Sequence, residues 1–190
     1  MKYALPNSRT LELRQEECAE SPREWAESST MVCFHRGYNL GDKHEHEPED
    51  YYSLQKRKDI VILPLYLYDH SGITMNTTGF SCQWDSGQVG FIYMTHAQIR
   101  ERFGVKRVSQ ALRTLAKEIL VGEVETYDQY LTGDVYYFTI EKVLTCDLGC
   151  EHTEDEDSCG GFYGDDILTN GVLDHIGDED RKYLKAELSK

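Results

Sequence analysis

The residues with the clearest chemical potential in this 190-residue chain are three cysteines and a histidine that fall within fourteen residues of one another. Thiolate sulfur and imidazole nitrogen are ligands that Zn²⁺ accepts, usually as two close pairs separated by a loop. Here the order is Cys146-x3-Cys150-x-His152-x6-Cys159. The third candidate ligand, His152, follows Cys150 after a single residue, with no loop between two pairs, and acidic residues occupy most of the gap before Cys159. This spacing fits no standard zinc pattern. We therefore predict loop thiols, with no metal and no cofactor.

A second set of metal-binding residue types, His44-Glu45-His46-Glu47, lacks the i, i+4 spacing that lets two helical imidazoles bind one ion. Pro48 follows at once, and we predict a solvated loop. The chain has no Gly-x-Ser-x-Gly elbow and no cysteine-protease motif. The glycine-rich run 160–164 has no Lys and lies in negative charge that would repel phosphate. These observations predict no catalytic residues and a protein that is not an enzyme.

Negative charge is concentrated in one part of the chain. Between Gly122 and Asp180 there are seventeen Asp and Glu residues and one base, Lys142, whereas residues 1–121 hold sixteen acids and fifteen bases. The formal net charge of the whole chain is -14. Charge of this size repels itself in a compact fold, so we expect it to face a basic surface of another protein. It also argues against direct binding of nucleic acid or of an anionic membrane, because phosphate contacts need Lys and Arg.

Composition indicates a folded protein. Hydrophobic residues make up 39% of the chain and aromatic residues 11%, which is enough to build a core. We predict a single domain, 1–190, with a polar entry segment (1–29), an α+β core (30–144) and an acidic C-terminal segment (145–190). No run of about 18 apolar residues could span a bilayer, and no signal-peptide apolar block stands near the start. We therefore expect a cytoplasmic protein with reduced cysteines.

Runs of apolar and β-branched residues between turn residues predict five strands. They are Thr30–His35, Asp59–Tyr68, Ile73–Thr78, Gly87–Met94 and Val135–Leu144. Within the second run, Pro64 cannot donate a ladder hydrogen bond, which predicts a bulge or an edge at that point.

Helical signals follow the strands. Thr95 and Gln98 form a capping-box pattern for a short helix that ends at Gly104. Apolar residues at helical spacing predict a helix over 108–120 that covers a sheet. Later, Phe162 and Tyr163 predict a short strand or turn, followed by a helix over 167–176. Strands in hairpin order without βαβ alternation predict an α+β fold with a mainly antiparallel sheet, helices on one face and an acidic C-terminal segment.

The segment Thr95–Leu120 also has the order of elements found in a winged helix, and it holds six bases against two acids. The strands that would form the wing carry Glu123, Glu125, Asp128 and Asp134 in or before them, and these carboxylates would face the phosphates. We therefore interpret the apolar face of the second helix as a packing surface.

Several stretches of the chain resemble a family of small acidic proteins from phages and integrated mobile elements of bacteria. They are SPREW (Ser21–Trp25), TMVCFHRGYNLGD (Thr30–Asp42), DIVILPLYLYDHSGITM (Asp59–Met75), VETYDQYLTGDVY (Val124–Tyr136) and DSCGGFYGDD (Asp157–Asp166). The resemblance carries no catalytic residues. It implies a setting in the bacterial host cytoplasm, where small acidic phage proteins often inhibit restriction or CRISPR nucleases, some by presenting carboxylates in place of phosphates.

Charge and resemblance together predict a phage-type inhibitor of a bacterial defence nuclease, anti-CRISPR or antirestriction, that acts as an acidic nucleic-acid mimic in a basic groove. We expect the carboxylates to gather on one exterior face, with Phe162 and Tyr163 as aromatic anchors. The predicted partner-binding residues are Glu151, Glu154, Asp155, Glu156, Asp157, Phe162, Tyr163, Asp165 and Asp166.

Three points stay open at this stage. The competing hypothesis is a metal-dependent hydrolase or nucleotide-cleaving counter-defence enzyme that uses the Cys and His cluster or the paired acids. Another is a viral structural or assembly protein whose acidic residues keep it in solution. The sequence also leaves the oligomeric state undecided between a monomer and a homodimer.

Overall fold

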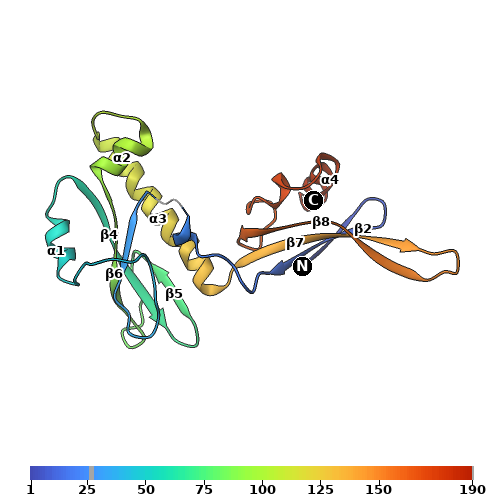
Figure 1. The fold of residues 1–190 in the computed structure, drawn as a ribbon, viewed down its shortest axis with the longest axis horizontal. Helices are drawn as coiled ribbons and strands as arrows, with labels where there is room; N and C mark the ends of the chain where they lie inside the picture. Colours follow the sequence, from blue (N-terminus) through green and yellow to red (C-terminus); the bar gives the residue numbers. More distant parts are fainter. Residues whose placement is uncertain (26–27, 190) are drawn as a thin grey trace. The chain divides into compact units, whose positions relative to one another are not determined.

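The computed structural model describes residues 1–25 and 28–189, which form two compact units (Figure 1). Unit 1 combines Met1–Glu20 with Gly133–Lys190, and unit 2 is Ser21–Thr132. Each unit has its own four-stranded antiparallel sheet and its own helices, so the predicted α+β class is confirmed. The boundary between the units falls at residues 20 and 132, whereas the sequence suggests boundaries at 29 and 144 within one domain.

Unit 2 is built on a sheet of strand order β3-β6-β4-β5, in which all pairs are antiparallel. The four strands are those expected from the apolar runs, with ends that differ by a few residues. Their bounds are β3 Thr30–Cys33, β4 Ile60–Asp69, β5 Ile73–Asn76 and β6 Ser86–Thr95. The helical elements are the 3-10 turn η1 Pro22–Glu24 and the helices α1 Asp50–Gln55, α2 His96–Phe103 and α3 Gln110–Thr132.

The two predicted helices after β6 are confirmed. Thr95 and Gln98 form the capping box of α2, and Gly104 ends it in the left-handed conformation. The second helix, α3, is longer than predicted, because its apolar stripe continues through Val124 and Tyr127 and both pack on the sheet. The α3 residues and the sheet residues that form this core include Ala116, Leu120, Met31, Leu65, Met75 and Ile92.

A β-bulge interrupts the central strand β6. Leu65 pairs with Gly90 but Tyr66 pairs with Gln88, so one extra residue, Val89, is accommodated there. A Cβ atom on Gly90 would lie 1.9 Å from the carbonyl oxygen of Val32 in the neighbouring strand β3, so only glycine fits at this position. The bulge thus lies on β6 opposite Leu65 and Tyr66, not at Pro64, which pairs with Phe91. The ladder described between β4 and β5 covers Tyr66–Asp69 and does not include Pro64.

Unit 2 also holds a buried ion-pair cluster centred on Arg23, whose side chain is 5% exposed. Its guanidinium donates to the carboxylates of Asp42 at 2.8 Å and Glu123 at 3.1 Å. Asp42 in turn accepts the Met31 N–H at 2.8 Å, and the neighbouring Gly41 N–H donates to the Tyr127 hydroxyl at 2.9 Å. The cluster joins η1, the loop after β3, and α3.

We predict that Arg23→Leu lowers the stability of unit 2 by about 3 kcal/mol or more, because it leaves two partly buried carboxylates without their cation. Both tryptophans, Trp25 and Trp84, lie in unit 2, so tryptophan fluorescence during urea unfolding follows this unit alone. Arg36→Leu is the matched control, because Arg36 is exposed. Equal urea midpoints for the two variants would show that the cluster contributes nothing to stability.

Unit 1 has a sheet of strand order β1-β2-β7-β8, again antiparallel throughout. Its strands are β1 Lys2–Leu5, β2 Arg9–Gln15, β7 Val135–Thr145 and β8 Glu151–Tyr163, followed by the 3-10 turn η2 Val172–Asp174 and the helix α4 Asp178–Leu188. One face of the sheet packs beneath the C-terminal segment. The core there includes Leu11, Leu13, Phe138, Ile140, Ile167, Val172 and Leu184.

Three expectations for unit 1 are corrected. The polar entry segment contains β1 and β2, which pair through a turn whose residues Asn7 and Ser8 have positive φ. The acidic run after residue 150 is a strand, β8, although it has no apolar alternation. The helix expected over 167–176 is a single 3-10 turn, because the C-terminal helix begins later, at Asp178.

A bidentate ion pair fixes α4 on the sheet. Arg9 of β2 donates to both carboxylate oxygens of Asp180, at 2.9 and 2.6 Å. The side chain of Asp180 is 6% exposed and that of Arg9 is 18% exposed. The contact joins residues at opposite ends of the chain.

We predict that Asp180→Asn costs about 2 kcal/mol, less than the ~3–5 kcal/mol of a fully buried pair because Glu156 remains beside Arg9. If α4 then opens from the sheet more often, amide hydrogen exchange over 9–15 should be about thirtyfold faster. Asp178→Asn, in the same helical turn but 82% exposed, is the control and should leave exchange unchanged. Equal exchange in the two variants would contradict this role of the pair.

Candidate functional site

The candidate partner-binding site is the distal part of the β7–β8 hairpin, residues 143–157, which we call the acidic hairpin. It contains six carboxylates and neither Lys nor Arg: Asp147, Glu151, Glu154, Asp155, Glu156 and Asp157. Pairing of β2 with β7 stops at Arg9 and Lys142, and the Val143 N–H still donates to Ser8 at 3.0 Å. Beyond that point, the ladder described for β7 is with β8 alone. Figure 1 shows the hairpin, in orange, extending past the end of β2.

The carboxylates of β8 are divided between the two faces of the strand. Glu154 lies opposite Lys142 on the face that also carries Ile140, whereas Asp155 lies opposite Glu141 on the other face. The expectation that all of them gather on one face is therefore wrong, because side chains in a strand alternate. Since β8 is the edge strand, the carboxylates instead form a narrow acidic rim along that edge.

One of the predicted contact residues takes part in the structure of unit 1. A register shift between Ile140 and Glu141 leaves Glu156 without a paired residue on β7. Its carboxylate lies 3.5 Å from Arg9 and 4.0 Å from Lys142. Glu156 is therefore partly neutralised, and the accessible charge of the strand comes from Glu151, Glu154, Asp155 and Asp157, all exposed.

The predicted aromatic anchors are not available to a partner in the way we expected. Phe162 is 5% exposed and packs on Phe138 and His175, with ring centroids 5.7 and 5.3 Å apart. It is a core residue of unit 1. Tyr163 is half-buried, and its hydroxyl donates to the Glu20 carbonyl at 3.4 Å.

The most exposed large apolar residue of the acidic hairpin is Leu148, at the turn between β7 and β8, which is 90% exposed, whereas Val143 is 37% exposed. Nothing in the sequence distinguished it, because a single Leu in a polar turn is common. It lies at the end of the acidic rim and is accessible, which the buried Phe162 is not.

Asp165 and Asp166 follow the other end of β8, away from the turn. Both are exposed. The Asp166 carboxylate accepts hydrogen bonds from the Leu168 N–H at 3.0 Å and the Thr169 hydroxyl at 3.1 Å. Asp166 therefore organises the turn that leads to η2, while both exposed carboxylates still add negative charge there.

The cysteines and histidine suggested by spacing do not converge. Cys146 and Cys150 close the turn, with the Cys146 N–H donating to the Cys150 carbonyl at 2.9 Å. His152 lies opposite Leu144, and Cys159 lies opposite Phe138, further along the strand. Among the residues that the structure describes, no group of three or more His, Cys, Asp or Glu side chains is arranged to hold a metal ion.

The thiols differ in chemical environment. Backbone N–H groups of Leu148 and Cys150 lower the pKa of Cys146, since they stabilise its thiolate. Burial, with a contribution from Asp42, raises the pKa of the Cys33 thiol to about 12. The thiolate is the reactive form of cysteine.

We therefore predict that iodoacetamide at pH 7.5 alkylates Cys146 well before Cys33, by at least about tenfold in rate. Peptide mapping by mass spectrometry measures both sites in one sample. Urea-unfolded protein is the control, in which the two rates should converge. Equal rates in the folded protein would contradict the assigned environments.

Comparisons with protein-family models, with curated proteins and with solved structures found no match to this chain. The resemblance to small acidic phage proteins therefore stays a prediction. In the ranges described, no helix is both long enough and apolar enough to cross a bilayer.

The carboxylates on the edge strand β8 have a second explanation that requires no binding partner. Exposed backbone groups at a sheet edge can pair with another chain, and charged side chains prevent this. The carboxylates of β8 could serve that purpose alone. The two explanations predict different behaviour for a variant in which these carboxylates are replaced by amides.

Proposed function

We propose that this protein is a non-enzymatic, phage-type inhibitor of a bacterial defence nuclease, of the anti-CRISPR or antirestriction kind. The acidic hairpin would enter the basic groove in which the nuclease holds nucleic acid, and Leu148 would contact an apolar patch there. The observation that carries the proposal is the set of six carboxylates without a base on residues 143–157, held on a paired backbone.

The spacing of charge along β8 supports this proposal. Five carboxylates fall within the seven residues 151–157, which span about 20 Å at about 3.4 Å per residue. One negative charge per ~4–5 Å, with Glu156 partly neutralised, is close to the ~3.4 Å spacing of phosphates along one DNA strand. A duplex carries charge at twice that density. The hairpin therefore fits a groove for a single strand better than one for a duplex.

Electrostatic attraction of this kind mainly speeds association and weakens as salt rises. Inhibition should accordingly be competitive with the nucleic-acid substrate and should decline between about 50 and 300 mM salt. Cleavage of labelled DNA by a panel of purified CRISPR effector complexes and restriction endonucleases measures it. No inhibition across the panel, and no host nuclease retained from a bacterial lysate, would overturn the proposal.

The decisive variant replaces the four free carboxylates: Glu151→Gln, Glu154→Gln, Asp155→Asn and Asp157→Asn. We expect an inhibition constant weaker by about tenfold or more at 100 mM salt, and a shallower salt dependence. The control removes the same charge from exposed residues of unit 2, Glu45→Gln, Glu47→Gln, Glu101→Gln and Glu118→Gln, and should inhibit like the parent protein. Unchanged inhibition by the β8 variant would show that the mechanism is wrong.

Sedimentation of the same variant separates the two explanations of the acidic edge. If the carboxylates only prevent edge pairing, the variant should self-associate while its monomer inhibits as before. If they bind a partner, inhibition should fall in the monomer itself. Stoichiometric zinc or manganese in the purified protein would instead favour the hydrolase hypothesis.

A further inference from the structure

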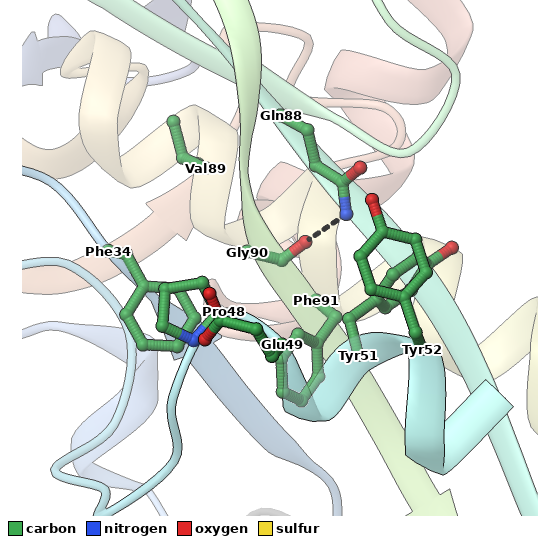
Figure 2. A pocket seen from close by; sticks show the side chains of 9 residues that line it. All are labelled: Phe34, Pro48, Glu49, Tyr51, Tyr52, Gln88, Val89, Gly90 and Phe91. Carbon is green, nitrogen blue, oxygen red and sulfur yellow. Dashed lines mark hydrogen bonds between the residues drawn. The ribbon is translucent and has the colours of Figure 1, made fainter.

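An aromatic pocket of about 500 Å³ lies in unit 2, separate from the acidic hairpin. This volume is in the range of small-molecule sites. Its floor is the backbone of β6 at Gly90. Figure 2 shows Tyr51 and Tyr52, from α1, on one side of the pocket and Phe34 with Pro48 on the other.

The fold keeps this pocket open. The bulge at Val89 distorts β6 here, and Gly90 contributes only backbone atoms to the pocket lining. The Gln88 side chain is turned back on the strand, where its Nε2 donates to the Gly90 carbonyl at 3.2 Å (Figure 2). The hollow therefore exists without any rearrangement of the chain.

The rings around it are held by mutual contacts. Phe91, 1% exposed, lies beneath Phe34 and Tyr51, with ring centroids 6.4 and 5.8 Å apart. Tyr51 meets Tyr52 edge to face at 5.6 Å, and Tyr52 is itself 64% exposed. The rings of Phe34 and Tyr51 are thus held by packing on Phe91, whereas the ring of Tyr52 remains largely exposed to solvent.

The loop that brings Pro48 and Glu49 to the pocket is also fixed. His46 packs on Phe91 at 5.7 Å, and its ring nitrogens lie 3.1 Å from the Tyr93 hydroxyl and 3.1 Å from Asp50. The prediction that residues 44–47 form a solvated loop is therefore only partly right, because both imidazoles are partly buried.

The charge of the pocket selects the class of ligand. Of the side chains that line it, only that of Glu49 is charged at neutral pH, and it is negative. Glu45 and Glu47 of the same loop are exposed nearby in the sequence. Phosphorylated ligands would be repelled, whereas a cation meets the negative faces of the rings and a carboxylate.

We infer that this pocket binds an organic cation, an alkylammonium or guanidinium group, between the rings of Phe34, Tyr51 and Tyr52 and beside Glu49. The group could belong to a small molecule or to a basic side chain of another protein, because the recognition chemistry is shared. The inference does not depend on the acidic hairpin or on its proposed target.

Titration of the isotope-labelled full chain with choline chloride, followed by NMR, tests it, with NaCl at the same ionic strength as the reference. We expect saturable shifts of the Gly90 amide and the Tyr52 ring. The neutral isostere 3,3-dimethylbutan-1-ol should bind at least about tenfold more weakly, because it lacks only the charge. Nα-acetylarginine amide serves as the second probe, and tighter binding than choline would indicate a protein side chain as the source.

Two variants and two controls locate the site. Tyr52→Leu keeps apolar volume and removes the ring, and Glu49→Gln removes only the charge; each should weaken choline binding by about fivefold. Tyr38→Leu and Glu118→Gln make the same changes at exposed positions that do not line the pocket and should have no effect. Absence of saturable shifts, equal binding of the isostere, or unchanged binding in both pocket variants would overturn the inference.

Discussion

The backbone ladder between β7 and β8 is the interaction on which the acidic surface depends. Residues 151–158 of β8 are all exposed, so no apolar burial holds them in a strand. The strand is instead secured at one end by Phe162 and Cys159, which pack in the core of unit 1, and in the middle by the contact of Glu156 with Arg9. Without this ladder the carboxylates would be a flexible acidic chain, and they would lose the full entropy of ordering on contact with a partner.

Unit 2 depends on a different constraint, the buried charge of Arg23. Three stretches for which we predicted a resemblance to phage proteins meet at this point, through Arg23, Asp42, Gly41 and Tyr127. They are Ser21–Trp25, Thr30–Asp42 and Val124–Tyr136. A buried cation must be paired, so each of these stretches is held against the others. These three stretches therefore supply contacts that close unit 2.

The parts of the fold that could be predicted are those in which one local rule decides. Apolar runs bounded by turn residues marked β4 and β6, and the Thr95 capping box and Gly104 marked both ends of α2. β1 and β2 were missed although Asn7 and Ser8 offered a turn signal, since the apolar residues on either side (Tyr3, Ala4, Leu5, Leu11 and Leu13) form short runs among charged residues. The acidic part of β8, residues 151–158, could not be recognised because a strand exposed on both faces needs no apolar pattern. The aromatic pocket was also missed, since its residues come from three separate stretches of chain.

The sequence by itself determined the local elements of unit 2, the separation of charge along the chain and the absence of any familiar catalytic motif, because each depends on residues close together. Only the tertiary structure decided which acidic side chains are free, that Phe162 belongs to a core, and that residues 1–20 share a sheet with residues 133–163. The physical reason is that exposure and pairing are set by contacts between residues far apart in the sequence, such as Arg9 with Asp180. The local pattern of residue types does not indicate which distant residues will meet.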